Sequence, residues 1–456
     1  MDNELTTDHK ISRTEKSDTN EELPYFNFIS NVSARRLPSL TRELAKRQYG
    51  ASKDLISLAE GVPNEVTFPF EKFTVKLKDG TEFDIAGQEL TAALQYIPTQ
   101  GYPPLVKSVK EFMRRVHDVS NWDKYETLVT GGSQEAMSKA LEMILNEGDS
   151  ILVQDPYYAG TEAILKPYNI KVIGVEQDRY GVIPKKLIEA LENCKKYTEE
   201  GGGNMPKVIY LNPTASNPSG RTIPTDRKLE IYKICCDYNI IILEDDAYFF
   251  LHFLDEQPVS FLSLDTQGRV IRLDSMSKTL SSGMRLGWVT GPKKLISQIE
   301  MHISSATIHS SVLSQVILEK LFQLWGIDGL LSYFARVRAF YKVRCDYTMA
   351  SMERHLKNLC EWEVPTGGMF IWFKVLGVSD VYEMLLNRGL KKHITFIPGQ
   401  NYMADPTKAC NYVRASYSKA SLQQIDKAMQ ILAELIREEH VLLRRKLDNL
   451  GNDIIR

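Results

Sequence analysis

The sequence has little of what marks several classes of protein. Six cysteines among 456 residues form no CxxC pair and no metal-ligand spacing, so we expect reduced, mostly buried thiols and neither a disulfide framework nor a metal site. No uncharged apolar run reaches the roughly 18 residues that a membrane span needs. Basic residues (56) and acidic residues (58) nearly balance. The charge therefore gives no reason to expect nucleic acid or anionic lipid as a partner.

The N-terminal 24 residues have few groups to bury and are acidic. This composition predicts a disordered polar tail over residues 1–24. The segment is too acidic for a mitochondrial presequence and has no signal-peptide core, so we expect a cytosolic location, with mitochondria as the weaker alternative.

Short β-branched runs alternate with helical patterns between residues 125 and 300. We expect strands at TLVT, SILVQ, IKVIGVE, KVIYLN, IIILED and RVIRLD, and helices at Ser133–Leu145, Thr161–Lys166, Pro184–Cys194 and Thr225–Tyr238. This alternation predicts an α/β fold with a mainly parallel central sheet and helices on both faces.

A chain of this length exceeds what one compact core usually holds, so two domains are expected. From about residue 335 the pattern changes to a helical stretch, a hairpin-like WEVPTGGMFIWFKV, short strands near TFIPG and YVRASYS, and a long amphipathic helix from Leu422. We predict a large domain over residues 86–330 and a smaller α+β domain over 331–456, which the segment 25–85 joins.

Polar clusters follow five of the predicted strands: GGSQ, DPYY, NPTASNPSG, DDAY and SMSK. In open α/β sheets, ligands bind outside the carboxyl ends of the strands. The five loops are therefore expected to converge on one crevice.

Lys278 gives the sharpest chemical signal. It lies just beyond a predicted buried strand, has serines on either side, and is followed seven residues later by Arg285. An amine nucleophile beside a phosphate-binding group has this pattern. A lone loop lysine is usually only exposed, and the neighbouring motifs are what favour the chemical interpretation.

Asp245 ends the apolar run IIILED, which places its carboxylate at the bottom of the crevice. A buried carboxylate is costly without a cationic partner, and a pyridinium nitrogen is such a partner. A helix N-cap or an ion pair with an arginine is the alternative. The GGSQ motif, with Ser133 and Gln134, opens a helix and offers backbone N–H groups to a phosphate, or it is only a cap.

Four more side chains lie at strand exits or within a strand. Tyr158 is placed to stack on a ring, and Asn217 and Tyr248 to hydrogen-bond to its oxygen, although each also fits simple packing. Arg414 interrupts an apolar strand pattern and needs an anionic partner. That partner is either the α-carboxylate of an amino acid or a carboxylate of the protein.

These blocks, in this order, resemble the class I/II aminotransferases of pyridoxal-5′-phosphate (PLP) fold type I, from about residue 30 to about 437. The chain looks most similar to the kynurenine/α-aminoadipate aminotransferases, in ISLAEGVPNEVTFPF, LQYIPTQGYPPL, TGGSQEAM, NPTASNPSG, EDDAYFFL, RVIRLDSMSKTLSSGMRLGWVTGP, GGMFIWFKV and VRASYS. Two features depart from the pattern. Glu60 stands where close relatives usually carry a small residue, and the tail beyond Ile436 is longer.

The resemblance implies a role for each site residue. Lys278 would hold PLP as a Schiff base and move the proton, and Asp245 would pair with the pyridine nitrogen. The other implied contacts are Tyr248 and Asn217 to the phenolic oxygen, Tyr158 on the ring, Ser133, Gln134, Ser275, Ser277 and Arg285 on the phosphate with Tyr96 from the other subunit of a homodimer, Arg414 on the substrate carboxylate, and Arg42 and Gly61 near its side chain. Segment 25–85 would cover the active site.

The implied reaction is ping-pong transamination from kynurenine, 2-aminoadipate, an aromatic or a similar amino acid to a 2-oxo acid such as 2-oxoglutarate. The same fold and cofactor also serve cysteine-conjugate β-lyases. A remote alternative is a PLP-sensing regulator, but the short acidic segment before the matched region is too small for a helix-turn-helix domain. A pseudoenzyme disagrees with the intact Lys278, Asp245, Arg285 and Arg414.

Overall fold

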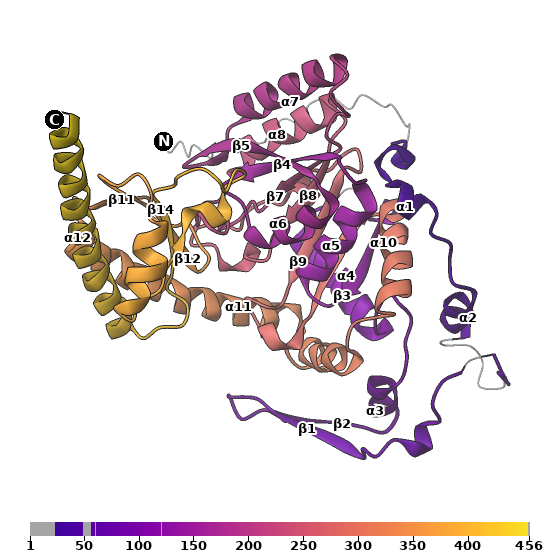
Figure 1. Cartoon of the computed structure of the whole chain (residues 1–456). Helices are drawn as coiled ribbons and strands as arrows, with labels where there is room; N and C mark the ends of the chain where they lie inside the picture. The colour runs from indigo at the N-terminus through magenta and orange to yellow at the C-terminus, as the bar shows by residue number, and fades with distance from the viewer. Residues whose placement is uncertain (1–22, 49–55, 60, 120, 455–456) are drawn as a thin grey trace, which may run out of the picture.

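The computed structural model describes residues 23–48, 56–59, 61–119 and 121–454. Nearly all of the predicted N-terminal tail, and Glu60, lie outside the described residues. The chain forms a large unit around one sheet and a smaller unit around another, with the C-terminal helix along the outside of the smaller unit (Figure 1).

The large sheet has eight strands in the order β3-β10-β9-β8-β7-β4-β5-β6. Their bounds are β3 Tyr125–Thr130, β4 Ser150–Asp155, β5 Lys171–Asp178, β6 Gly181–Val182, β7 Val208–Leu211, β8 Ile241–Asp245, β9 Val270–Ser275 and β10 Gly287–Pro292. Strands β5, β4, β7, β8 and β9 pair in parallel, whereas β10 pairs antiparallel with both of its neighbours. The predicted mainly parallel α/β fold is confirmed. The sequence pattern did not reveal β10, because its glycines weaken the strand signal.

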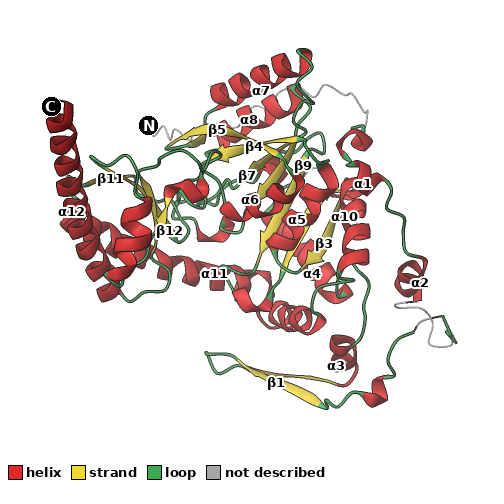
Figure 2. Ribbon diagram, viewed as in Figure 1, coloured by secondary structure: helices red, strands yellow, loops and turns green. Residues whose placement is uncertain are grey.

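Helices cover both faces of the large sheet (Figure 2). They are α4 Pro103–Val116, α5 Ser133–Ile144, α6 Ala159–Leu165, α7 Pro184–Glu199, α8 Thr225–Asp237, α9 Phe261–Leu264 and α10 Lys293–Ala306. Alternate residues of one strand enter different cores: Leu152 packs with α4, α7 and α8, while Ile151 and Val153 pack with α5 and α10. Strands buried on both faces explain the continuous apolar runs in the sequence.

The smaller sheet is antiparallel, in the order β11-β12-β14-β13. Its strands are β11 Cys360–Trp362, β12 Phe370–Val375, β13 Ile397–Pro398 and β14 Tyr412–Ser416, with a π-helix over Met384–Gly389. It packs against α12 (Leu422–Ile454) and the end of α11 (Val312–Leu356). Helix α11 bends where Gly326 leaves helical geometry (φ 63°, ψ −179°) and then continues past residue 330, the predicted domain boundary.

The N-terminal segment contains α1 (Asn31–Ala34), α2 (Leu40–Gln48), the hairpin β1 (Lys72–Lys76) and β2 (Glu82–Ala86), and α3 (Gly87–Leu94). Several of its contacts fall on the large unit. The Tyr25 hydroxyl donates to Gly268 O at 3.1 Å, and Ser30 N donates to Met143 O at 2.7 Å. That this segment joins the small domain stays a prediction.

Short 3-10 turns connect many of these elements. They are Tyr25–Phe28, Glu65–Thr67, Trp122–Lys124, Lys166–Tyr168, Phe249–Leu251, Ser282–Met284 and Gly399–Tyr402. All six cysteines are free. Within the ranges that the structure describes, no helix combines the length and apolarity that crossing a bilayer requires.

Candidate active site

Lys278 lies in the turn that follows β9, partly buried, with its Nζ 5.8 Å from the centroid of the Tyr248 ring. Burial lowers the pKa of its amine below the usual 10.5, the Asp245 carboxylate opposes this shift, and Arg285 and Arg414 lower the pKa further. A lowered pKa increases the fraction of neutral amine, which is the nucleophilic form.

Asp245 ends β8 and is only 7% exposed. Its Oδ2 accepts a hydrogen bond from the Tyr210 hydroxyl at 2.7 Å, whereas its buried Oδ1 has no partner among the described residues. Burial raises the pKa of the carboxyl to about 6, the Tyr210 hydrogen bond opposes this, and Asp246 raises the pKa further. The described residues give Asp245 neither a helix to cap nor an arginine partner, so it fits a cationic ring N–H.

Arg285 lies where a phosphate group is expected. Its Nη2 donates to Gly131 O at 3.0 Å, and its Nη1 donates to Ser277 Oγ at 3.3 Å. Ser275 Oγ accepts from Ser277 N at 3.2 Å, so both hydroxyls lie near the guanidinium. An exposed guanidinium beside two serine hydroxyls offers several donors to an anion.

The first turn of α5 lies against Arg285. Gly132 precedes the helix at φ 91°, and a Cβ there would come within 2.8 Å of Arg285 Nη2, so glycine is needed for this approach. Ser133 and Gln134 begin the helix, where backbone N–H groups have no intrahelical partner. The Tyr158 hydroxyl donates to Gln134 Oε1 at 3.3 Å, which brings Tyr158 to the same place. The arrangement fits a phosphate.

Arg414 lies on β14, with its guanidinium carbon 4.2 Å from the Phe370 ring centroid and 5.0 Å from that of Tyr402. Its Nη1 donates to Asn217 Oδ1 at 3.0 Å, and its buried Nε has no partner among the described residues. Burial lowers the pKa of the guanidinium. No described carboxylate forms an ion pair with it, which leaves its anionic partner to be supplied by a ligand.

Tyr248 precedes the 3-10 turn Phe249–Leu251 and is 4% exposed. Its ring lies 6.1 Å from that of Phe370 in an edge-on contact. Burial raises the pKa of its phenol above the usual 10.0, and the Asp245 charge raises it further. The phenol therefore stays protonated near neutral pH and can donate a hydrogen bond.

Sequence reasoning missed Tyr210, Asn212, Phe370 and Tyr402. Asn212 Nδ2 donates to Asp245 O at 2.6 Å, and its Oδ1 accepts from Asn217 N at 2.7 Å, so one amide links two predicted site residues. Asn212 directly follows the strand KVIYL, and that position was a usable signal. Tyr210 lies inside the apolar run itself, where nothing distinguishes it from a core residue.

Arg42, Gly61 and Tyr96 lie elsewhere on the chain. Arg42, on α2, donates to the backbone oxygen of Ile97, and the half-exposed Tyr96 ring lies 6.0 Å from the His309 ring. Helix α2 lies beside the large unit, away from the middle of its sheet (Figure 1). The roles predicted for Arg42, Gly61 and Tyr96 in the site stay predictions.

The family described as "Aminotransferase class I and II" matches residues 53–432 of this chain. The bovine (Bos taurus) protein named "Kynurenine/alpha-aminoadipate aminotransferase, mitochondrial" is 40% identical over 91% of this chain and 99% of its own length. The crystal structure of aminotransferase Aro8 from Candida albicans has a TM-score of 0.81 at 24% identity, over 92% of this chain and 99% of that one. The kynurenine aminotransferase of Pyrococcus horikoshii, solved "in complex with PMP, KYN as substrates and KYA as products", has a TM-score of 0.72 at 29% identity, over 91% and 98%.

The expected cytosolic location is wrong by this comparison. The bovine protein and its relatives from Mus musculus and Rattus norvegicus, 37% and 35% identical to this chain, are all named as mitochondrial. These names point to mitochondria rather than the cytosol, so the acidity of the N-terminal residues was a poor guide. The β-lyase and regulator alternatives gain no support from the comparisons.

Proposed function

This chain belongs to the class I and II aminotransferases, and we propose that it moves the amino group of kynurenine, 2-aminoadipate or an aromatic amino acid to a 2-oxo acid such as 2-oxoglutarate. Amino acid transamination is the activity of the family, and pyridoxal 5′-phosphate is its cofactor. The names of the bovine relative and of the archaeal structure support this donor class.

One observation carries the proposal: two buried charged groups near Lys278 lack an internal partner for one atom each. Asp245 Oδ1 and Arg414 Nε have no hydrogen-bond partner among the described residues. The first suits the protonated nitrogen of a pyridine ring, and the second suits an α-carboxylate. A ligand that satisfies both at once is an amino acid held on PLP.

When bound, PLP supplies an electron-accepting ring that weakens the Cα–H bond of the amino acid. The protein's own groups do the rest. Asp245 keeps the ring nitrogen protonated, Arg414 orients the substrate through its carboxylate, and the Lys278 amine holds the cofactor and then moves the Cα proton.

The remaining predicted residues hold the cofactor in this proposal. Arg285 and the N-terminus of α5 bind the phosphate, Tyr158 stacks on the ring, and Asn217 and Tyr248 donate to its phenolic oxygen. The phosphate donors are completed by Ser133, Gln134, Ser275 and Ser277.

The proposal includes a homodimer in which Tyr96 reaches the other subunit's phosphate site and segment 25–85 covers the pocket with Arg42 and Gly61. Large apolar side chains of this segment are exposed in the single chain, among them Phe26 (74%), Leu37 (84%) and Val66 (92%). Exposed apolar groups gathered on one segment are typical of an interaction surface. Light scattering gives the mass, and hybrids of Tyr96→Phe and Lys278→Ala chains test the sharing. Sharing predicts one site per hybrid that lacks both groups and one that has both.

A panel of amino donors assayed with 2-oxoglutarate tests the function. We expect kynurenine, 2-aminoadipate or an aromatic amino acid to give the highest kcat/KM, with formation of glutamate. A protein that releases pyruvate from a cysteine conjugate without any 2-oxo acid, and forms no glutamate from the panel, would contradict the proposal.

A further inference from the structure

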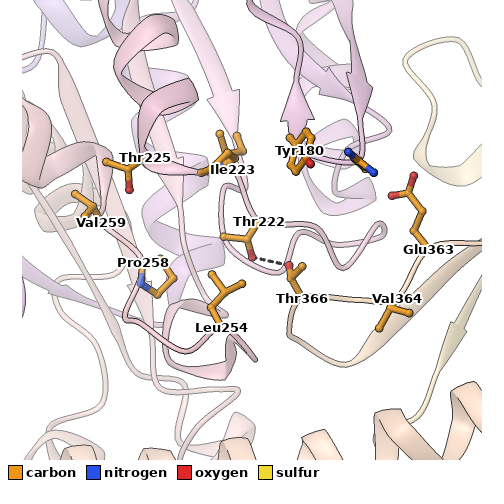
Figure 3. A pocket seen from close by; sticks show the side chains of 12 residues that line it. Tyr180, Thr222, Ile223, Thr225, Leu254, Pro258, Val259, Glu363, Val364 and Thr366 are labelled. Atoms are coloured by element: carbon orange, nitrogen blue, oxygen red, sulfur yellow. Dashed lines mark hydrogen bonds between the residues drawn. The ribbon is translucent and has the colours of Figure 1, made fainter.

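A second cleft lies between the large and small units and shares no residue with the Lys278 site (Figure 3). Its volume is about 450 Å³, a size typical of small-molecule sites. The large unit contributes the turn before β6, the start of α8 and the loop after Phe249–Leu251, and the small unit contributes the loop between β11 and β12. The side chains used below are Arg179, Tyr180, Thr222, Leu254, Glu363, Val364 and Thr366.

The walls of this cleft leave apolar side chains uncovered. Val364 is 67% exposed, Tyr180 is 44% exposed and Leu254 is 39% exposed, and each comes from a different segment of the chain. Figure 3 shows them around the same opening, together with Ile223. Apolar groups that gather around a concave site favour an apolar ligand.

The charges on the cleft favour an anion. Two charged residues line it, and the carboxylate of one, Glu363, accepts hydrogen bonds from Arg221 Nε and Nη2, both at 3.1 Å. The other, Arg179, makes no hydrogen bond or ion pair with any described residue, and its guanidinium carbon lies 4.6 Å from the Tyr180 ring centroid. A guanidinium stacked on a ring with its donors unused matches a carboxylate.

Hydrogen bonds connect the cleft wall to the active site. The Thr366 hydroxyl donates to Thr222 Oγ1 at 2.8 Å, the bond drawn in Figure 3, and Thr366 N donates to Gly220 O at 2.8 Å. These bonds hold the loop that carries Asn217, which accepts from Arg414. A ligand that displaces this wall therefore displaces a group that positions Arg414.

The same wall leads to Arg414 along the small unit. Phe370, whose ring stacks on Arg414, follows Thr366 by four residues. Gly368, between them, donates its N–H to Leu251 O at 2.9 Å, so this stretch is anchored on the large unit. Both neighbours of Arg414 are thus joined to one side of the cleft.

We propose that this cleft is a second ligand site, for a flat apolar molecule with one carboxylate such as an aromatic carboxylic acid, and that its occupation changes substrate binding at Arg414. Arg179 binds the carboxylate, and Tyr180, Leu254 and Val364 cover the ring. The coupling rests on the proposed function, whereas the binding does not.

Calorimetric titration of the PLP-saturated Arg414→Ala protein with indole-3-acetate tests the binding, because this variant lacks the active-site carboxylate group. We expect one molecule per chain, and an affinity at least tenfold lower for neutral indole-3-acetamide. Adding Arg179→Gln or Val364→Asp should lower the affinity for indole-3-acetate at least tenfold. The matched control is Arg336→Gln, an exposed arginine over the Tyr333 ring on another surface, which should bind as before. No binding, or equal loss in Arg179→Gln and Arg336→Gln, would overturn the site.

Steady-state kinetics of the native chain test the coupling. Indole-3-acetate should change the rate even at saturating amino donor, and this component should vanish in Arg179→Gln while it persists in Arg336→Gln. Pure competition with the amino donor in all three proteins would overturn the coupling. A chain that binds the probe in calorimetry but transaminates no donor would instead contradict the proposed function.

Discussion

Arg272 and Arg414 show how differently two strands hold a buried arginine. Arg272 is fully buried and pairs with three carboxylates: Asp274 at 2.9 Å, Asp246 at 3.0 Å and Glu244 at 3.2 Å. Arg414 has an amide oxygen and two aromatic rings around it and pairs with no described carboxylate. The first arginine is neutralised within the protein, and the second needs an anion from outside.

The acidic side chains repeat this contrast within three successive residues. Glu244 and Asp246 pair with Arg272, while Asp245, between them, is directed to the other face and bonds to Tyr210. Side chains of a strand alternate between faces, so one short motif serves a structural cluster and a ligand site. Internal partners, more than burial, separate structural charges from ligand-binding ones.

The largest expected effect is on chemistry, at Lys278. Lys278→Ala should lower kcat roughly 10⁴-fold, because the group that moves the proton is lost. Stopped assays with the best donor measure it. Ser281→Ala, an exposed neighbour of the same loop, is the control and should retain activity. A Lys278→Ala enzyme with normal turnover would remove the lysine from the mechanism.

Arg272→Met should lower the free energy of unfolding by about 3–5 kcal/mol, because it leaves Glu244, Asp246 and Asp274 buried without their cation. Denaturant unfolding measures the loss. Arg336→Met, at an exposed site, should cost less than about 0.5 kcal/mol. Equal losses in the two variants would contradict a structural role for the Arg272 cluster.

Arg414→Met should do the reverse. We expect kcat/KM to fall about 10²–10³-fold, since the bond to the substrate carboxylate is lost. The free energy of unfolding should change by less than about 1 kcal/mol, because no internal carboxylate is left unpaired. The comparison between the two arginines fails if this variant is as unstable as Arg272→Met.

The smallest effect concerns Asp245 and pH. Its folded pKa of about 6 exceeds the unfolded value of 3.8, so between these values the unfolded state loses the proton first and stability falls as pH rises. Asp245→Asn removes this cost, so the cofactor-free variant should be more stable than the native chain by about 2 kcal/mol at pH 8 and equal to it below pH 3.8.

Urea titrations of the cofactor-free proteins at both pH values measure the Asp245 effect. Activity with PLP should fall in the same variant, because the ring nitrogen loses its anionic partner. A variant that is less stable at pH 8 and fully active would mean that Asp245 is a structural residue like Asp246.

The sequence predicted the order of strands and helices in the large unit well, because runs such as IIILED are apolar throughout and end in polar clusters. It also predicted that the loops after those strands approach one another, and Asp245, Lys278, Asn217 and Arg285 do lie near the Asn212 and Arg414 contacts described above. Partners inside apolar runs, such as Tyr210, gave no signal.

Contacts that depend on three-dimensional packing could not be predicted. The insertion of β10 between β3 and β9 is set by pairing across more than 150 residues of sequence, and the interdomain cleft depends on the loop between β11 and β12 lying beside the start of α8. Arg272 looked like any arginine in a strand, because its three carboxylates are visible only after folding.

The most direct test of the account is where PLP attaches. Purified protein saturated with PLP, reduced with borohydride and digested should carry the phosphopyridoxyl group on the peptide that contains Lys278, and Lys278→Ala protein should carry none there. Label on a different lysine, or none at all, would contradict the account.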